Sequence, residues 1–302
     1  MHPKLKNIAR SIKIGMTSVL PGPAPVRQTA RRLIALKTMG LFRDELTFQR
    51  NGFTWTGATA SSITESIYTH DHYQDEHLDQ LTDWLKAHTD FQRPVIVNVG
   101  ANIGDVALPL TRTGRRIVAI EPNPETFARL ERNVRQNGLT EKITCFPVAI
   151  SSSAGQAELV IATDPGNSEL RESADRLGLD GVDQRRAIVK VTTARLDGLL
   201  ESNGIALRDV ALVWSDTQGF ESQVIASAPG LWEAGTPLWV EIWPKGLACH
   251  GGVDQFVQLC ERYFRRMITA TELASEPQPI SAIRSLVAGL KDAEFTDALL
   301  IP

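Results

Sequence analysis

A short segment from Val95 to Asp105 constrains the fold of this chain more than any other. It begins with Val95-Ile96-Val97, three consecutive β-branched residues without alternation of apolar and polar positions. Such a run is typical of a strand buried on both faces, as in a parallel sheet. Two glycines, Gly100 and Gly104, follow at once, and a helix-like pattern starts at Asp105. The segment therefore predicts a strand, a tight turn and a helix N-terminus, where backbone N–H groups can approach a ligand.

The spacing of the glycines indicates which ligand this turn can accept. Dinucleotide-binding turns carry G-x-G-x-x-G, whereas Asn102 and Asp105 occupy the second and third glycine positions here. An acid at the start of the helix would repel a pyrophosphate. We therefore expect a phosphate-free adenosyl ligand such as S-adenosylmethionine; the alternative is an ordinary turn between a strand and a helix.

Strand and helix patterns alternate after this segment, as expected for βαβ units. Apolar runs predict further strands at residues 116–120, 143–150, 210–216, 238–243, 266–270 and 298–301. Helices are expected at residues 125–136, 196–200, 222–227, 253–264 and 280–290. Residues 151–195 interrupt the alternation, and we expect 157–162 and 187–193 to pair as strands within them. The pattern predicts an α/β fold with a mostly parallel sheet.

The N-terminal region differs in charge from the rest, because residues 1–50 hold ten lysines and arginines against two acids. A basic helix is predicted at 28–41, and three roles compete for it: a solvated face with packing contacts, weak contact of residues 1–43 with an anionic partner or membrane surface, or a disordered leader. Residues 47–56 predict a hairpin with Asn51-Gly52 as a type I′ turn. We expect a basic extension over 1–60 and the main domain over 61–302.

The composition of the whole chain excludes several classes of protein. A net charge of −3 excludes a globally basic nucleic-acid binder. No apolar run reaches the roughly 18 residues of a membrane-spanning helix, and the first 20 residues lack the pattern of a secretory leader. The three cysteines form no disulfide or zinc pattern, which favours a reducing compartment. We therefore expect a cytoplasmic protein.

The segment from His70 to His77 holds three histidines and three acids within eight residues. This density suggests a metal site, but the spacing matches no standard zinc pattern and no cysteine lies nearby. A polar helix start that faces the substrate is the favoured interpretation, and a solvated helix face is the alternative. We predict no metal ion.

Several acids follow directly after predicted strands, where ligands of open α/β sheets bind. Glu121 ends the second strand of the core and can accept both hydroxyls of a ribose; the alternative is a surface acid. Asp216 and Glu241 end later strands, next to the expected position of the transferred group, although Asp216 could instead cap the following helix. His250 lies in a loop on the same side and is a candidate proton acceptor near neutral pH, unless it is merely solvated.

In their order and spacing, these residues and others resemble the FkbM-type methyltransferases from about Tyr73 to the C-terminus. The matching motifs are Tyr73-x-x-Glu76, Asn98-Val-Gly-Ala-Asn-Ile-Gly104, Glu121-Pro-Asn-Pro124, Leu130-x-x-Asn133-x-x-x-Asn137, Val148-Ala149 with Gly155, Leu196-Asp197, Asp216-x-x-Gly219-x-Glu221 and Glu241. The resemblance implies a Rossmann-like class I methyltransferase fold, with a seven-stranded mostly parallel sheet and helices on both faces. It also implies S-adenosylmethionine as cofactor.

The resemblance assigns roles by position. The cofactor would be bound by Asn98, Gly100, Asn102, Gly104, Glu121, Pro122, Asn123, Ala149 and Asp216. Tyr73 and Glu76 would contact the substrate. The chain departs from the family twice, since the family usually has Asp in place of Asn98 and Glu in place of Gln218. Asn98 can still form hydrogen bonds but carries no charge for the amino group of the cofactor.

The leading functional hypothesis is an O-methyltransferase that acts on a sugar, a glycan or another hydroxylated small molecule. The candidates for removing the hydroxyl proton are Asp216, Glu241 and His250. Two alternatives stay open: a nucleic-acid methyltransferase that uses the basic N-terminus, and a non-catalytic module that keeps the fold. The first lacks the D/N-P-P-Y/F signature of amino-group methylation, because the fourth strand ends in Ser215-Asp-Thr-Gln218.

Overall fold

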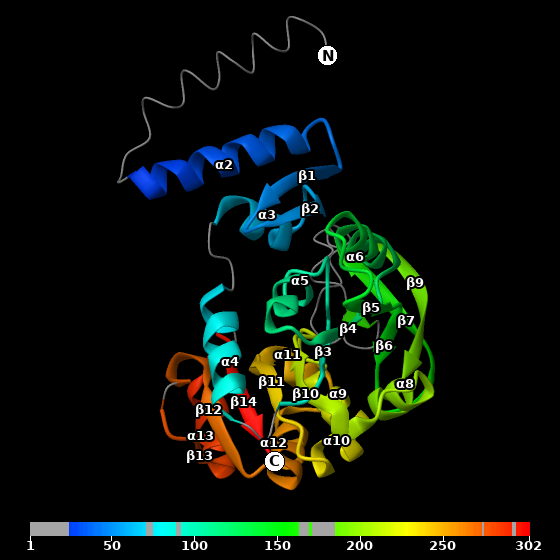
Figure 1. The fold of residues 1–302 in the computed structure, drawn as a ribbon, viewed down its shortest axis with the longest axis vertical. Helices are drawn as coiled ribbons and strands as arrows, with labels where there is room; N and C mark the ends of the chain where they lie inside the picture. The colour runs from blue at the N-terminus through cyan, green and yellow to red at the C-terminus, as the bar shows by residue number, and fades with distance from the viewer. Residues whose placement is uncertain are drawn as a thin grey trace, which may run out of the picture. The chain divides into compact units, whose positions relative to one another are not determined.

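A computed structural model describes residues 24–70, 75–88, 92–162, 169–170, 185–273, 275–291 and 294–302 of the chain. They form two compact units, one ending at Tyr73 and the other beginning at Gln74. Figure 1 shows the helices and strands of both units. Among the described residues, no helix combines the length and the apolar character needed to cross a bilayer.

The N-terminal unit consists of two helices and a hairpin. Its elements are α2 (Ala24–Gly40), β1 (Glu45–Arg50), β2 (Phe53–Ala58) and α3 (Ser62–Thr69). The expected hairpin is confirmed, because β1 and β2 pair antiparallel and the turn residues Asn51 and Gly52 have φ of +53° and +80°. Both values lie in the left-handed region that a type I′ turn requires.

Helix α2 packs within this unit. Leu36 is fully buried, and the guanidinium of Arg32 donates a hydrogen bond of 3.1 Å to the carbonyl oxygen of Thr69 at the end of α3. The packing role that the sequence suggested for this helix is thus present. Just beyond the helix, Leu41 and Phe42 are strongly exposed. The suggested contact with an anionic surface stays a prediction, as does the functional boundary near residue 60.

The second unit is built on a large sheet. Its strands are β3 (Val95–Val99), β4 (Arg116–Ile120), β5 (Ile143–Phe146), β10 (Val210–Ser215), β11 (Leu238–Ile242), β12 (Arg266–Thr269), β13 (Gln278–Pro279) and β14 (Thr296–Ile301). The strand order is β13-β12-β14-β11-β10-β3-β4-β5. Strand β14 runs antiparallel to both of its neighbours, whereas the pairs from β11 to β5 are parallel. This confirms the expected Rossmann-like α/β fold, with the two-residue β13 added to the seven predicted strands.

The direction of winding reverses at β3, because the chain proceeds from β3 to β4 on one side and later returns to β10 on the other. A crevice at the carboxyl ends of the strands is expected at such a reversal, and ligands of open α/β sheets bind there. All residues of β3 and β10 are buried, as their unbroken apolar runs predicted. The reversal therefore places the segment after Val99 beside the segment after Ser215.

Helices cover both faces of the sheet (Figure 1). One layer holds α8 (Leu196–Ser202), α9 (Glu221–Ser227), α10 (Pro229–Glu233), α12 (Val253–Tyr263) and α13 (Ile283–Gly289). Val95, Val97 and Val99 of β3 share a buried cluster with residues of these helices. The remaining helices of this unit are α4 (Asp75–Ala87), α5 (Ala107–Leu110), α6 (Pro124–Gln136) and α11 (Pro244–Cys249), with short 3₁₀ turns at Thr111–Thr113, Leu207–Asp209, Ala270–Glu272 and Ile280–Ala282.

The alternate residues of the central strands form a row on the other face. Asn98 of β3 lies beside Trp214 of β10, which lies beside Trp239 of β11. The two indoles stack with ring centroids 4.9 Å apart, and the ring of His77 in α4 lies 6.0 Å from Trp239. Helix α4 therefore packs on the face of the sheet that Asn98 shares.

The third predicted strand, 143–150, is wrong as one element. It divides at Pro147 into β5 of the main sheet and β6 (Val148–Ile150) of a second sheet, because proline has no N–H to donate to a ladder. The second sheet has the order β6-β9-β7-β8, with β7 (Gly155–Ala162), β8 (Glu169–Leu170) and β9 (Arg185–Ala194). Its antiparallel pair β7 and β9 confirms the strands expected within 151–195.

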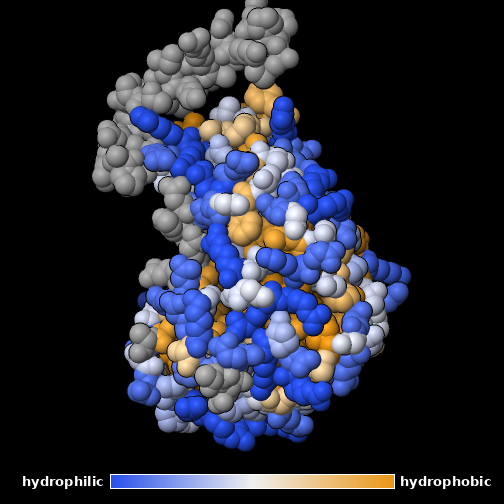
Figure 2. Space-filling model, viewed as in Figure 1, coloured by the Kyte–Doolittle hydropathy of each residue, from blue (hydrophilic) through white to orange (hydrophobic). Residues whose placement is uncertain are grey.

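The surface is mostly hydrophilic on the face seen in Figure 2, with small hydrophobic patches. Four of the described residues are large, apolar and exposed: Leu41, Phe42, Ile188 and Phe295. All three cysteines are free thiols, and burial raises the pKa of Cys145 to about 12. Cys249 and Cys260 are buried and Cys145 is partly buried, so these cysteines behave as apolar packing residues.

Candidate functional site

The loop after β3 is held close to its neighbouring strands. The backbone N–H groups of Gly100 and Ala101 both donate to the carbonyl oxygen of Ile120, at 3.0 and 2.9 Å. Gly100 has φ of +79°, and a Cβ placed on it would lie 1.9 Å from the carbonyl oxygen of Asp216. Only glycine can occupy this position without displacing backbone. The loop therefore contacts the end of β10 directly.

Glu121 ties this loop to the end of β4. One carboxylate oxygen accepts the N–H of Asn102 at 3.0 Å, and the other accepts the N–H of Asn123 at 2.8 Å. Burial raises the pKa of Glu121 to about 7, while these two hydrogen bonds act in the opposite direction. Each carboxylate oxygen has a second lone pair, so the group can accept further hydrogen bonds from a ribose.

Helix α6 also supports the loop. Asn123 caps the helix by accepting the N–H of Glu125 at 3.1 Å. Asn133 is fully buried and its amide donates to the carbonyl oxygen of Ile103 at 2.8 Å, while Gln136 donates to its oxygen at 2.7 Å. The side-chain amide of Asn133 thus provides a hydrogen-bond donor for the backbone carbonyl of Ile103 in the loop.

We predict that Asn133→Leu lowers the free energy of unfolding by about 1–3 kcal/mol, because it leaves buried polar groups without partners. Cofactor affinity is expected to fall as well, since the loop loses its support. Chemical denaturation and calorimetric titration with S-adenosylhomocysteine measure the two effects. Asn203→Leu, at an exposed asparagine after α8, is the control. Equal stability of both variants would contradict this role.

Asn98 is completely buried in β3, and neither polar atom of its side chain has a hydrogen-bond partner among the described residues. Leaving a buried amide unsatisfied costs about 1–3 kcal/mol per group. Such a residue at the winding reversal of an α/β sheet fits a site whose ligand supplies the missing partners.

The segment after β10 brings two predicted residues together. The side-chain amide of Gln218 donates to Asp216 Oδ1 at 2.9 Å and to Glu241 Oε2 at 3.5 Å. Glu221 Oε1 accepts both the N–H and the hydroxyl of Thr217 at 2.9 Å. It is thus Glu221, rather than Asp216, that satisfies the donors of the turn before α9.

Strand β14 adds a carboxylate to this group. Asp297 lies directly opposite Glu241 in the antiparallel pair of β14 and β11, so both side chains share one face. Burial, together with the charges of Asp216, Glu221 and Asp297, raises the pKa of Glu241 to about 10. Burial and the nearby charges of Asp216 and Glu221 raise the pKa of Asp297 to about 7.

Two further buried acids, Asp105 and Glu221, interact electrostatically with Asp216. Burial and the charge of Asp216 raise the pKa of Asp105 to about 7, and burial raises the pKa of Glu221 to about 7. The pKa of Asp216 is also raised by burial, against the hydrogen bond from Gln218. Clustered carboxyl groups with raised pKa values are typical of sites that exchange protons or receive a cation.

His250 is buried rather than solvated, at the C-terminal cap of α11. Its ring packs edge-on against Phe220, with centroids 4.7 Å apart. Because Phe220 ends the turn that begins at Asp216, the structure brings His250 to the same turn. The described residues contain no cluster of three or more histidines, cysteines or acids arranged to hold a metal ion.

Other predicted positions lie apart from this turn or outside the description. Ala149 is buried in β6 of the second sheet, and Pro122 is half-buried beside Glu121. Tyr73 and the side chain of Glu76 lie outside the described residues. Their suggested contacts with substrate stay predictions.

Sequence reasoning missed Asp297 and the bridge formed by Gln218. The signal for Asp297 is weak, since it is one acid before an apolar run, and its place depends on the register of β14. Gln218 was noted only as a departure from the family. A non-glycine residue with left-handed φ, here +56°, is not visible in a sequence.

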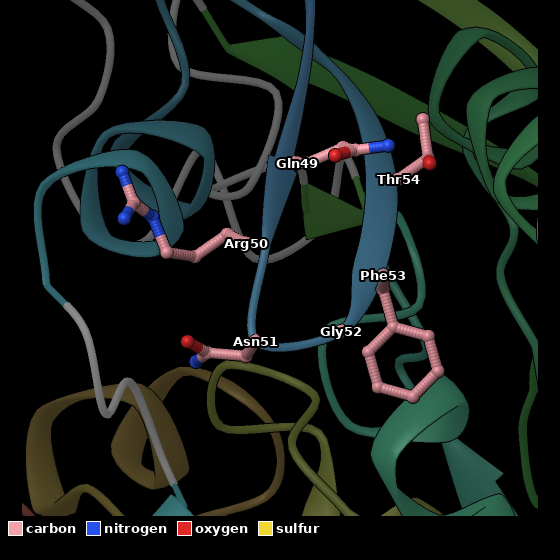
Figure 3. Close-up of a pocket in the computed structure, with 6 residues that line it drawn as sticks. All are labelled: Gln49, Arg50, Asn51, Gly52, Phe53 and Thr54. Carbon is pink, nitrogen blue, oxygen red and sulfur yellow. The ribbon is translucent and has the colours of Figure 1, made fainter.

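A separate hollow of about 490 Å³ lies at the tip of the N-terminal hairpin. Its lining residues are Gln49, Arg50, Asn51, Gly52, Phe53 and Thr54 (Figure 3). Figure 3 shows that the side chain of Arg50 points away from Phe53, and its guanidinium donates to the carbonyl oxygen of Tyr68 at 3.1 Å. These side chains include no acid that could accept a proton.

Comparison with known proteins identifies the family. The model of the methyltransferase FkbM domain matches residues 98–266, more than half of the chain. The chain belongs to the FkbM methyltransferase family. The match starts at Asn98 and includes the loop, Glu121, Asp216 and Glu241, so the site described above lies within it except for Asp297. Residues 98–266 accordingly form a methyltransferase domain of a family that depends on S-adenosylmethionine.

Two relatives support this assignment at modest identity. The 2-O-methyltransferase NoeI of Sinorhizobium fredii is 29% identical over 142 residues, which cover 44% of this chain and 56% of NoeI. The methyltransferase sdnD of Sordaria araneosa is 29% identical over 177 residues, which cover 51% of this chain and 68% of sdnD. The match thus spans little more than half the length of NoeI.

Solved structures with distant similarity include a putative transferase from Pyrococcus horikoshii, at 12% identity over 97% of both chains and a TM-score of 0.43. A putative O-methyltransferase from Klebsiella pneumoniae has 9% identity over 97% and 95% of the two chains and a TM-score of 0.39. The strand order of the sheet identifies the Rossmann-like fold of this chain.

Proposed function

We propose that this protein transfers a methyl group to a hydroxyl of a sugar, a glycan or a natural-product small molecule. The observation that carries the proposal is the pair of carboxylates, Asp216 and Glu241, joined by Gln218 at the winding reversal of the sheet. A hydroxyl acceptor must lose a proton, and this pair can receive it. The relative NoeI is a 2-O-methyltransferase, an activity of the same kind.

In this proposal the loop of Gly100, Asn102 and Gly104 binds the cofactor through its backbone. Glu121, flanked by Pro122 and Asn123, accepts the ribose hydroxyls, and Ala149 contacts the adenine. The methionine end then lies towards Asn98 and Asp216. The unsatisfied amide of Asn98 and the direct contact between Gly100 and Asp216 support this orientation.

The cofactor supplies an electrophilic methyl group on a sulfonium sulfur. The sulfur is the leaving group of an in-line displacement. The chain would hold the acceptor oxygen opposite that carbon and exclude water. A C–O bond forms as the C–S bond breaks, and the hydroxyl proton passes to a base of the protein. Asp216 is the proposed base, with Glu241 as its partner and His250 as the alternative.

The cofactor assignment is tested by titration calorimetry with S-adenosylhomocysteine. Glu121→Gln is expected to weaken binding about 10-fold or more, because hydrogen bonds to a charged group contribute about 1.5–3 kcal/mol. Glu131→Gln, at an exposed acid of α6, is the matched control and should bind as the wild type does. Equal affinities for Glu121→Gln and wild type would contradict the ribose role.

The acceptor class is tested with methyl-labelled S-adenosylmethionine and a panel of glycosides and hydroxylated natural products. We expect label in the product as an O-methyl group, identified by NMR, and loss of turnover in Asp216→Asn. Transfer of the label to nitrogen or carbon would refute the proposal of O-methylation. Asp216→Asn with wild-type turnover would refute the proposed base.

A further inference from the structure

Gln218 has a strained backbone that the surrounding structure maintains. Its φ of +56° lies in the left-handed region, which is unfavourable for a residue with a Cβ. The next residue, Gly219, has φ of +99°, and a Cβ on it would lie 2.3 Å from the carbonyl carbon of Gly246 in α11. This close packing against α11 fixes the turn, so the strain at Gln218 is not free to relax.

The strained conformation places one amide between two carboxylates. The Nε2 atom carries two hydrogens, which serve Asp216 at 2.9 Å and Glu241 at 3.5 Å. The parallel register, with Ser215 beside Val240, brings the two acids next to each other, and the amide of Gln218 connects their side chains. A glutamate at this position would instead add a further negative charge.

The surroundings of the bridge are predominantly acidic. Asp216 and Glu241 are faced by Asp105 after β3, Glu221 from α9 and Asp297 from β14. Two imidazole groups pack on neighbouring aromatic rings: His77 of α4 against Trp239, and His250 at the cap of α11 against Phe220. The protonation of the bridged pair therefore responds to any cation that binds in the crevice.

We propose that Gln218 is a positioning residue that joins Asp216 and Glu241 into one proton-accepting unit, whose protonation follows the charge of the bound methyl donor. This inference rests on the proposed function. A sulfonium cation beside the unit favours its deprotonated form, so the unit is ready to receive a proton. When the methyl group has moved to the acceptor oxygen, the sulfur is neutral and the proton released from the hydroxyl resides on the unit.

The two cofactor forms allow a test without the acceptor. S-Adenosylmethionine carries the sulfonium charge, and S-adenosylhomocysteine does not. Titration calorimetry in buffers of different ionisation enthalpy, repeated across pH, counts the protons released on binding. For the wild type we expect S-adenosylmethionine to release more protons than S-adenosylhomocysteine. This difference rises and then falls with pH, and its midpoint on the high-pH side reports the apparent pKa of the unit in the complex with S-adenosylhomocysteine.

Two variants remove the bridge in different ways. Gln218→Leu keeps the size of the side chain without its donor, and Gln218→Asn tolerates left-handed φ but is too short to reach both acids. Losing a hydrogen bond to the charged form should raise the midpoint by about one pH unit in both variants. Gln223→Leu in α9 is the matched control and should leave the midpoint unchanged.

The outcomes separate this inference from the proposed function. Failure of the wild type to bind either cofactor form would overturn both. Binding with the same proton release for the two forms would overturn the inference and leave the cofactor assignment intact. An unchanged midpoint in folded Gln218→Leu and Gln218→Asn would likewise show that Gln218 does not control the unit.

Discussion

Gly100→Ala is expected to lower the free energy of unfolding by about 4 kcal/mol or more and to abolish cofactor binding. A residue with a Cβ pays about 1–2 kcal/mol for left-handed φ. The larger part of the loss is steric, because the new Cβ would lie 1.9 Å from the carbonyl oxygen of Asp216. That atom belongs to backbone following a fully buried strand, so it cannot move without separating β3 from β10.

Gly114→Ala is the matched control for this prediction. Gly114 has the same φ of +79°, but a Cβ on it would meet no heavy atom within 4 Å. We expect a loss of about 1–2 kcal/mol from the backbone alone and cofactor affinity equal to that of the wild type. Chemical denaturation and calorimetry measure both variants. Similar losses for the two would show that the contact between Gly100 and Asp216 is unimportant.

Much of the fold could be predicted because a strand that is buried on both faces appears in the sequence as a run of apolar residues. The runs Val95-Ile96-Val97 and Val210-Ala-Leu-Val became parallel central strands, and Asn51-Gly52 became the expected turn. The division of 143–150 at Pro147 was missed, because an apolar run does not show to which sheet each half belongs. The short strand β13 has no sequence signal of its own.

Only part of the candidate site, likewise, could be predicted from the sequence. Glu121, Asp216 and Glu241 could be placed near one another because parallel strands end at the same edge of a sheet. Asp297 could not, since its position opposite Glu241 depends on the register of an antiparallel strand. The bridge by Gln218 depends on a left-handed φ that the contact between Gly219 and Gly246 enforces. Such tertiary contacts decide how the predicted acids are joined.

The stability of the ligand-free protein is expected to fall as the pH rises from 5 to 9. The folded pKa of Glu241 is about 10 and that of Asp297 about 7, against ordinary values of 4.5 and 3.8. Between the ordinary and the folded pKa, the folded chain retains protons that the unfolded chain has released. Unfolding therefore becomes easier as pH increases, by up to about 1.4 kcal/mol per pH unit for each such group.

Glu241→Gln removes the group with the largest of these shifts and keeps its shape. We expect the advantage of the variant over the wild type in free energy of unfolding to grow from about 1 kcal/mol at pH 5 by up to about 5 kcal/mol at pH 9, because each of the four pH units contributes up to about 1.4 kcal/mol. Denaturation across pH measures the difference, and the exposed Glu131→Gln should follow the wild-type curve. Parallel curves for Glu241→Gln and wild type would mean that Glu241 titrates normally in the folded protein. Added S-adenosylmethionine should reduce the loss in the wild type, because a cation in the crevice compensates the ionised carboxylates.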